Sequence, residues 1–159
     1  MKKQLLLLLV GLLTSIGYAQ CPIPGTSFVG DYTIQQTSAI NPSLGELSFE
    51  TQVITLSVGA TANARQFSAV WAEELGIGQP AMDVTFTLDC PNGNSVIVDA
   101  GLDTFLACGG PGAITLGPAP TTGVFDENDD SSFTLIVEEF QTSGGCTAGP
   151  ATAEYVLTK

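Results

Sequence analysis

Apolar side chains recur at every second position along most of this chain, and they hardly ever recur with the spacing of a helix. In the stretch DVTFTLDC (83–90), Val84, Phe86 and Leu88 share one face and polar residues occupy the other. Such alternation is typical of a strand with one face in the core and one in water. Similar runs occupy residues 31–37, 51–58, 65–71, 95–98, 113–116, 132–140 and 152–158. The pattern predicts about eight short strands.

Turn-forming residues separate these runs. Asn41-Pro42, Pro91-Asn92-Gly93, Gly117-Pro118 and Gly149-Pro150 are examples. Glycine permits positive φ and proline cannot donate to a sheet, so both end strands. One segment, AVWAEELGIG (69–78), has some helical character, and we expect most of it to be strand and loop. The sequence therefore predicts one all-β domain, an antiparallel β-sandwich of immunoglobulin-like or jelly-roll-like type.

The first residues have the features of a secretory signal peptide. Lys2 and Lys3 precede an apolar run over 5–13 that is too short to span a bilayer. Small residues end the segment at Ala19, so we expect cleavage there and a single domain over 20–159. A lipoprotein is disfavoured because the polar Gln20 precedes Cys21. The expected location is secreted, extracellular or at the cell surface, with no membrane span in the mature chain.

Acidic residues greatly outnumber basic ones. The chain has 4 Lys and Arg against 16 Asp and Glu. Lys2 and Lys3 leave with the signal peptide, so Arg65 and Lys159 alone oppose the sixteen acids, a formal charge of −14. Nucleic acids and anionic lipids require a basic surface, so partners of these kinds are excluded. Solubility in a salty or calcium-rich medium is the simplest reason for the acidity.

Four cysteines, Cys21, Cys90, Cys108 and Cys146, remain after export. An even number in an oxidising compartment indicates two disulfides. A zinc site is the alternative, but the chain has no C-x-x-C pair and no histidine. Three connectivities are possible, and we expect Cys90–Cys108 and Cys21–Cys146. Each bond would stabilise the fold by about 3–5 kcal/mol if chain entropy sets its effect.

Several segments in order resemble a known kind of module. They are FVGDYTIQQ, VITLSVG, RQFSAVW, ITLGPAP, the acidic DENDDS turn, a late cysteine and the closing YVLTK. Together they are similar to β-modules that recur in secreted and surface proteins of Bacteroidetes, often in long adhesin-like chains. The resemblance covers nearly all of residues 28–159 and implies no known activity. A sorting domain commonly follows in such chains, and because the sequence stops at Lys159, anchoring by that route is not expected.

The sequence lacks the usual catalytic residues. It has no histidine, which removes Ser-His-Asp and Cys-His arrangements, the H-E-x-x-H zinc site and the common general base near neutral pH. The GGPG run (109–112) lacks the lysine and spacing of a phosphate loop. Two facing carboxylates can hydrolyse a glycoside, but the neighbours Glu73-Glu74 and Glu138-Glu139 would point to opposite faces of a strand. We therefore expect that the protein is not an enzyme.

The acidic stretch DENDD (126–130) is a candidate calcium loop. Asp126, Asn128 and Asp130 alternate as ligands do in the first half of an EF-hand loop. The second half fails, because Ser131 replaces the glycine and Val137 replaces the final glutamate. The run also resembles the cadherin linker motif D-x-N-D-N without its companion acids. Calcium is therefore the one cofactor that the sequence suggests, and a hydrated turn before a strand is the alternative interpretation.

Trp71 is the only tryptophan and shares a strand face with Phe67 and Ala69. An exposed Trp71 would offer a platform for a sugar ring, whereas a buried one would be part of the core, and the core is favoured. Tyr32 and Tyr155 allow the same two interpretations.

The leading hypothesis is a secreted non-catalytic module with a structural or adhesive role, its partner an extracellular protein or glycan. The alternative is a soluble glycan-binding protein, assisted by calcium, and a small hydrolase comes third.

Overall fold

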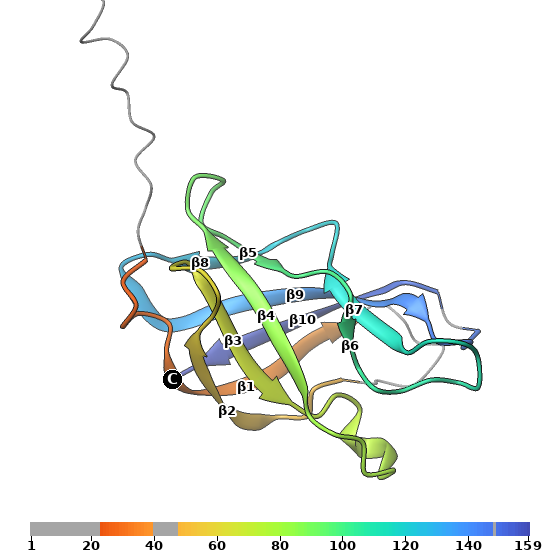
Figure 1. The fold of residues 1–159 in the computed structure, drawn as a ribbon. Helices are drawn as coiled ribbons and strands as arrows, with labels where there is room; N and C mark the ends of the chain where they lie inside the picture. The colour runs from red at the N-terminus through yellow and green to blue at the C-terminus, as the bar shows by residue number, and fades with distance from the viewer. Residues whose placement is uncertain (1–22, 40–47, 148) are drawn as a thin grey trace, which may run out of the picture.

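The computed structural model describes residues 23–39, 48–147 and 149–159, and this part of the chain is built from strands (Figure 1). The strands are β1 (Gly30–Ala39), β2 (Gln52–Val58), β3 (Ala64–Ala69), β4 (Met82–Asp89), β5 (Ser95–Val98), β6 (Leu102–Asp103), β7 (Ile114–Pro118), β8 (Gly123–Asp126), β9 (Asp129–Ser143) and β10 (Ala151–Thr158). One short 3-10 helix, η1 (Glu73–Leu75), follows β3. The all-β prediction is confirmed, and β6 and β8 are the strands that the sequence pattern does not predict.

The strands close into a barrel, so the predicted β-sandwich is wrong. Neighbouring strands follow the order β10-β1-β2-β3-β4-β5-β8-β9, and β9 pairs again with β10. All of these pairings are antiparallel. Strands β7 and β6 continue the sheet outward from β9. Closure gives every strand of the ring two neighbours, which removes the free edges that a sandwich keeps.

Two strands form the corners that join what would otherwise be two sheets. Residues 52–56 of β2 pair with β1, and residues 57–58 pair with β3. In the same way, residues 123–124 of β8 pair with β5 and residues 125–126 pair with β9. Each corner therefore depends on only two residue pairs to one of its neighbours. The alternation of inward and outward side chains is the same in such a barrel as in a sandwich, so the sequence pattern alone does not separate them.

Side chains fill the interior of the barrel. The alternate residues of β4, Met82, Val84, Phe86 and Leu88, are all buried. Aromatic rings meet edge to face, as Phe28 does with Phe133 at 5.8 Å between centroids. Trp71, Tyr32 and Tyr155 are each less than 2% exposed. These three residues belong to the core, as favoured by the sequence.

Arg65 is fully buried near one end of the barrel. The acceptors of its side-chain hydrogen bonds are all backbone carbonyls. Nε and Nη2 donate to Ser27 O at 3.0 and 2.8 Å, and Nη2 also donates to Pro24 O at 3.0 Å. Nη1 donates to the carbonyls of Ala62 and Ala64 at 2.9 and 2.8 Å. Burial lowers the pKa of the guanidinium, and the nearby Tyr32 opposes this effect. Arg65 thereby fastens the segment before β1 to the turn before β3.

Both ends of the described chain lie at this same end of the barrel, which we call the terminal end (Figure 1). Asp130 Oδ2 accepts the backbone N–H of Phe28 at 3.1 Å and Nζ of Lys159 at 2.5 Å. The Tyr32 hydroxyl donates to the carbonyl of Asp130 at 2.5 Å, and Lys159 Nζ lies 5.4 Å from the Tyr32 ring centroid. Strand β9 starts here and runs to Ser143 at the opposite end.

The disulfide pairing differs from the predicted one. Cys108 is bonded to Cys146, with their Cα atoms 4.9 Å apart, so the expected pairs Cys90–Cys108 and Cys21–Cys146 are wrong. The bond joins the loop between β6 and β7 to the loop after β9, and Cys108 N–H also donates to Gly144 O at 2.9 Å. One disulfide thus joins two described cysteines where two bonds were expected. Cys90 is not a free thiol, and Cys21 lies outside the described residues.

The predicted signal peptide, residues 1–19, also lies outside the described residues, as does the start of the predicted domain at residue 20. Within residues 23–39, 48–147 and 149–159, no helix has the length and apolar character needed to cross a membrane.

Candidate functional site

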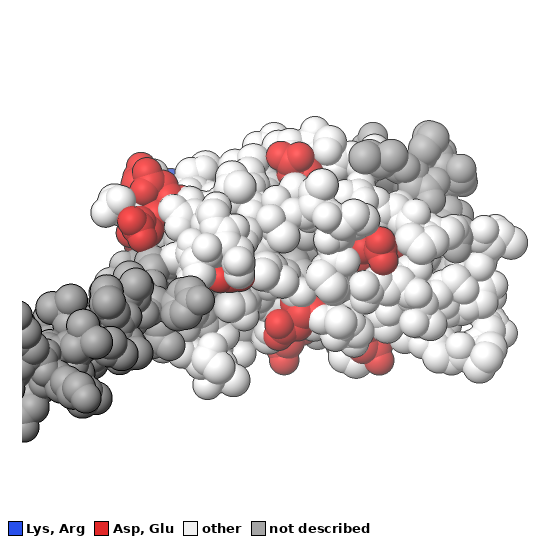
Figure 2. All heavy atoms as spheres, turned by 90° about the horizontal axis from the view of Figure 1, so that it is seen from above, with Lys and Arg blue, Asp and Glu red and all other residues white. Residues whose placement is uncertain are grey.

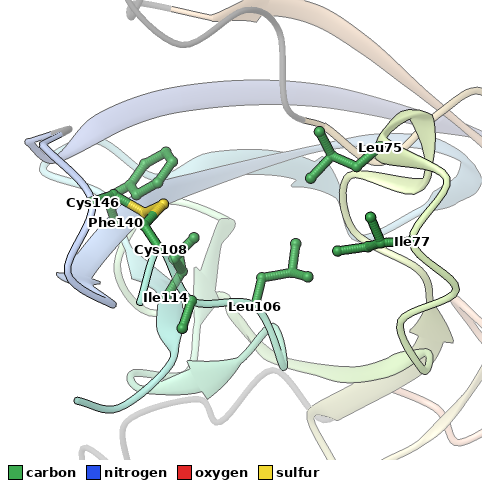
Figure 3. Close-up of a pocket in the computed structure, with 8 residues that line it drawn as sticks. Leu75, Ile77, Leu106, Cys108, Ile114, Phe140 and Cys146 are labelled. Atoms are coloured by element: carbon green, nitrogen blue, oxygen red, sulfur yellow. A yellow bond between two sulfur atoms is a disulfide. The ribbon is translucent and has the colours of Figure 1, made fainter. Parts of the chain in front are cut away.

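An apolar cavity of about 110 Å³ opens at the end of the barrel opposite the terminal end (Figure 3). In Figure 3, Leu75 and Ile77 lie on one side of the open space and Leu106 and Ile114 on the other, next to the disulfide. No lining side chain carries a charge. The walls are Leu75, Ile77, Leu106, Ala107, Cys108, Ile114, Phe140 and Cys146. The cavity therefore joins the η1 segment to the loops that the disulfide holds.

Two large apolar side chains of the cavity wall reach solvent, and so does Phe105, which precedes the wall residue Leu106. Leu75 is 47% exposed, Ile77 65% and Phe105 53%. Phe105 precedes Leu106 of the wall and has a left-handed φ of 60°, with its N–H donating to Asp103 Oδ1 at 2.7 Å. A left-handed backbone costs a non-glycine residue about 1–2 kcal/mol, and here it accompanies an aromatic ring that is turned to solvent. We call Leu75, Ile77, Phe105 and the cavity the apolar end.

Trp71 packs against Phe140, one of the residues that line the cavity. Its ring meets that of Phe140 edge to face at 5.8 Å. Trp71 Nε1 donates to Glu139 Oε1 at 3.1 Å, and the Tyr155 hydroxyl donates to the same oxygen at 3.2 Å. The N–H of Phe49 in turn donates to the Tyr155 hydroxyl at 3.4 Å. One buried carboxyl group thus connects the rear wall of the cavity to β10.

The loop that carries Leu75 and Ile77 is fastened at both ends. Gln79 Nε2 donates to the carbonyls of Trp71 and Ala72 at 2.8 and 2.7 Å. Ala72 has a left-handed φ of 58°, and its N–H donates to Ser48 O at 2.8 Å. These bonds fasten the two ends of the loop, and its apolar side chains Leu75 and Ile77 line the cavity while remaining partly exposed.

Glu139 is the one acidic side chain among the buried described residues, with 4% of its surface exposed. Burial raises its pKa to about 7, while the hydrogen bonds from Trp71 and Tyr155 oppose the rise and the charge of Glu74 adds to it. The group therefore changes its charge near neutral pH, directly behind the cavity.

We expect the stability contributed by Glu139 to fall as the pH rises to neutrality. The folded state binds this proton up to about pH 7, whereas the unfolded chain releases it near the ordinary pKa of 4.5. Between these values the unfolded state binds fewer protons, so the free energy of unfolding decreases with pH, by about 3 kcal/mol in total. Glu139→Gln keeps an oxygen acceptor and removes the titration.

Urea unfolding of both proteins from pH 4.5 to pH 8 measures this effect, because their difference removes the titration of the other acids. Glu139→Gln is expected to resemble the native protein at the acidic end and to be more stable above pH 7. An identical pH dependence in the two proteins would contradict the prediction.

The DENDD stretch forms the turn of the β8–β9 hairpin at the terminal end. Asp126 Oδ1 accepts the N–H of Asn128 at 2.9 Å. Asp130 is directed instead to Phe28 and Lys159, and the hydrogen bond from Lys159 is the main reason why its pKa is lowered. Two of the candidate calcium ligands, Asp126 and Asn128, therefore bond to each other within the turn, whereas Asp130 is engaged by Phe28 and Lys159. Among the described residues no group of three or more acidic, cysteine or histidine side chains is placed to hold a metal.

We expect calcium to leave the melting temperature unchanged, because Asp130 is neutralised by Lys159 and Asp126 is used by the turn. Melting residues 20–159 with millimolar calcium and with chelator, at matched ionic strength, checks this. A bound ion at a hundredfold excess over its Kd would add about 2.7 kcal/mol. A saturable rise that disappears when Asp126 and Asp130 are both replaced by asparagine would restore the calcium loop.

The exposed surface of the described residues is acidic overall. Arg65 is buried, so Lys159 is the one basic side chain of the described residues that reaches solvent, and it pairs with Asp130. Figure 2 shows one face with scattered acidic side chains and almost no basic atoms. This charge distribution over the described residues opposes the approach of an anion.

The structure brings together only part of what the sequence singled out. Cys108 and Cys146 lie in the cavity wall, and Trp71 lies directly behind it. The candidate calcium ligands lie at the far end of the barrel, and Cys90 is outside the cavity wall. The burial of Glu139 could have been predicted from the sequence, because residue 139 lies on the same inward face of the strand as Leu135 and Val137. The cavity itself depends on loops with no periodic pattern.

No protein-family model, curated protein or solved structure matches this chain. The functional conclusion therefore depends on the barrel and its apolar end.

Proposed function

We propose that this chain is an exported, non-catalytic β-barrel module with an adhesive or interaction role, and that it contacts its extracellular partner through the apolar end. The observation that carries the proposal is the exposure of Leu75 and Ile77 in the wall of an apolar cavity, and of Phe105 next to the wall residue Leu106, on a strongly acidic protein. Exposed apolar clusters with polar surroundings commonly mark interaction sites.

The position of the site supports the same role. Asp130 and Lys159 mark the terminal end, and Asp130 lies near the start of β9 whereas Phe140 of the cavity wall lies near its other end. A protein held at its ends would therefore present the apolar end outward. The predicted export and the resemblance to adhesin-like modules agree with this arrangement.

The absence of catalysis is supported by the chemistry of the site. The cavity wall offers no acid, base or nucleophile, since its two cysteines are joined in a disulfide. Glu139 is the nearest acid in the network behind it, and it is buried and bonded to Trp71 and Tyr155. Trp71 is buried, so the glycan-binding alternative loses the aromatic platform that the sequence suggested.

The test attaches residues 20–159 to beads through a tag after Lys159 and measures bead retention under flow. The surfaces are a methyl-terminated monolayer, a hydroxyl-terminated monolayer and cellulose. We expect retention on the methyl surface alone. Replacing Leu75, Ile77 and Phe105 together by serine should reduce retention to that of the hydroxyl surface.

The matched control replaces three other exposed apolar residues, Val53, Val58 and Val124, by serine. This variant is expected to be retained like the native protein. Equal losses in both variants would mean that adhesion is general stickiness and would refute the proposal. Retention on cellulose without retention on the methyl surface would favour the glycan-binding alternative.

A further inference from the structure

We infer that the cavity at the apolar end is a binding site for one small, uncharged hydrophobic molecule, with a single ring or a short branched alkyl group. This inference rests on the proposed function in that both use the apolar end. It adds the chemical class of a ligand that enters below the exposed rim.

The size of the cavity limits the ligand. Its volume is about 110 Å³, and an engineered apolar cavity of about 150 Å³ in another protein binds benzene. The cavity is partly open to solvent where Leu75 and Ile77 of its wall are exposed, so a ring could enter with a substituent left outside. Figure 3 shows these two residues opposite Leu106. A molecule of one ring therefore fits, and a larger rigid one does not.

The chemistry of the walls limits its charge. All eight lining residues are aliphatic, aromatic or sulfur-containing, so an ionised group inside would lose its hydration without a partner. A carboxylate at the mouth would also meet an acidic protein whose exposed basic residue, among those described, is Lys159 at the far end. Fatty acids and other anions are therefore poor ligands, and an uncharged molecule is favoured.

The cavity is formed before any ligand arrives. Phe140 is held by its contact with Trp71, and Cys108 is held by the bond to Cys146. Gln79 fixes the opposite loop through its two hydrogen bonds. A ligand thus avoids the entropy cost of ordering the site, and it covers Leu75 and Ile77, which are exposed without it.

Trp71 provides a direct measurement. It is the only tryptophan of the chain and touches Phe140 of the cavity wall, so its emission reports on occupancy. Toluene is titrated into residues 20–159, and benzoate serves as the anion of nearly the same shape. We expect a saturable change with toluene and an affinity for benzoate that is at least about tenfold weaker, a difference of 1.4 kcal/mol.

The matched variants are Ala107→Phe, which adds a ring at an exposed position in the cavity wall, and Ala60→Phe at an exposed position outside the wall. Ala107→Phe should abolish the toluene response, and Ala60→Phe should keep it. Ile77→Ala removes only part of the wall and should weaken the binding of toluene. Melting curves of each variant show that it is folded.

The inference is overturned if toluene gives no saturable change, if benzoate binds equally well, or if Ala107→Phe responds like Ala60→Phe. Bead retention separates this result from the proposed function. Native beads that adhere while toluene fails to bind remove the ligand site and keep the adhesive surface. Toluene binding without adhesion keeps the ligand site and removes the adhesive role.

Discussion

Replacing Arg65 by methionine is expected to lower the free energy of unfolding by about 3–5 kcal/mol, which places this change among the most damaging single substitutions. The guanidinium donates five hydrogen bonds to four backbone carbonyls, and it is 0% exposed. Methionine retains much of the apolar stem and leaves the carbonyls of Pro24, Ser27 and Ala62 without this donor. Urea unfolding at pH 7 measures the loss.

Arg65→Lys is the control that separates charge from geometry. Lysine keeps the positive charge but presents it as a point with three donors, so it cannot serve four carbonyls in the same plane. We expect the free energy of unfolding of Arg65→Lys to lie between those of the native protein and of Arg65→Met. Limited proteolysis of the segment before β1 should follow the same order. A loss below about 1 kcal/mol for methionine would show that water replaces the guanidinium at these carbonyls.

Removing the Cys108–Cys146 bond is expected to cost about 4 kcal/mol, since it closes a loop with a sequence separation of 38. For a domain of this size the melting temperature should fall by about 10–20 °C. The double variant Cys108→Ala with Cys146→Ala, compared with the native protein by thermal unfolding, measures this effect.

The two single variants provide the internal control, because each breaks the same bond and should lose about the same stability. Non-reducing peptide mapping of the native protein should recover Cys108 linked to Cys146. The double variant should also lose the toluene response, since both sulfurs belong to the cavity wall. A double variant as stable as the native protein would mean that hydrogen bonds such as Cys108 N–H to Gly144 O hold the loops alone.

The strands were predictable from the sequence, whereas the way they close was not. Alternation in β4 or β9 reports only that one face of a strand is buried, and this is equally true of a barrel and a sandwich. Closure depends on β8, which has four residues beside an acidic turn and so carries almost no periodic signal. It also depends on Ser57 and Val58 at the end of β2, which pair with β3 whereas the rest of β2 pairs with β1.

The site was less predictable than the fold, for two separate reasons. Arg65 and Glu139 continue the inward faces of Phe67 and Val137, so the alternation indicates burial for both, although burial was predicted for neither. Leu75, Ile77 and Leu106 lie in η1 or in loops, where no period assigns a face. The disulfide was mispredicted for a related reason, since spacing along the chain does not show which loops meet at one end of a barrel.

The corners of the barrel also determine where the protein opens most easily. The ladder between β9 and β10 has eight residue pairs, whereas β5 and β8 have two, Ser95–Val124 and Val96–Gly123, with one further backbone bond from Phe125 N–H to Asn94 O. Local fluctuations follow the weakest set of contacts, so backbone amides along the β5–β8 seam should exchange with solvent before those of β10. Each such opening uncovers two unpaired strand edges, which are templates for adding a strand from another molecule. The barrel is therefore protected against aggregation only while β5 and β8 remain paired.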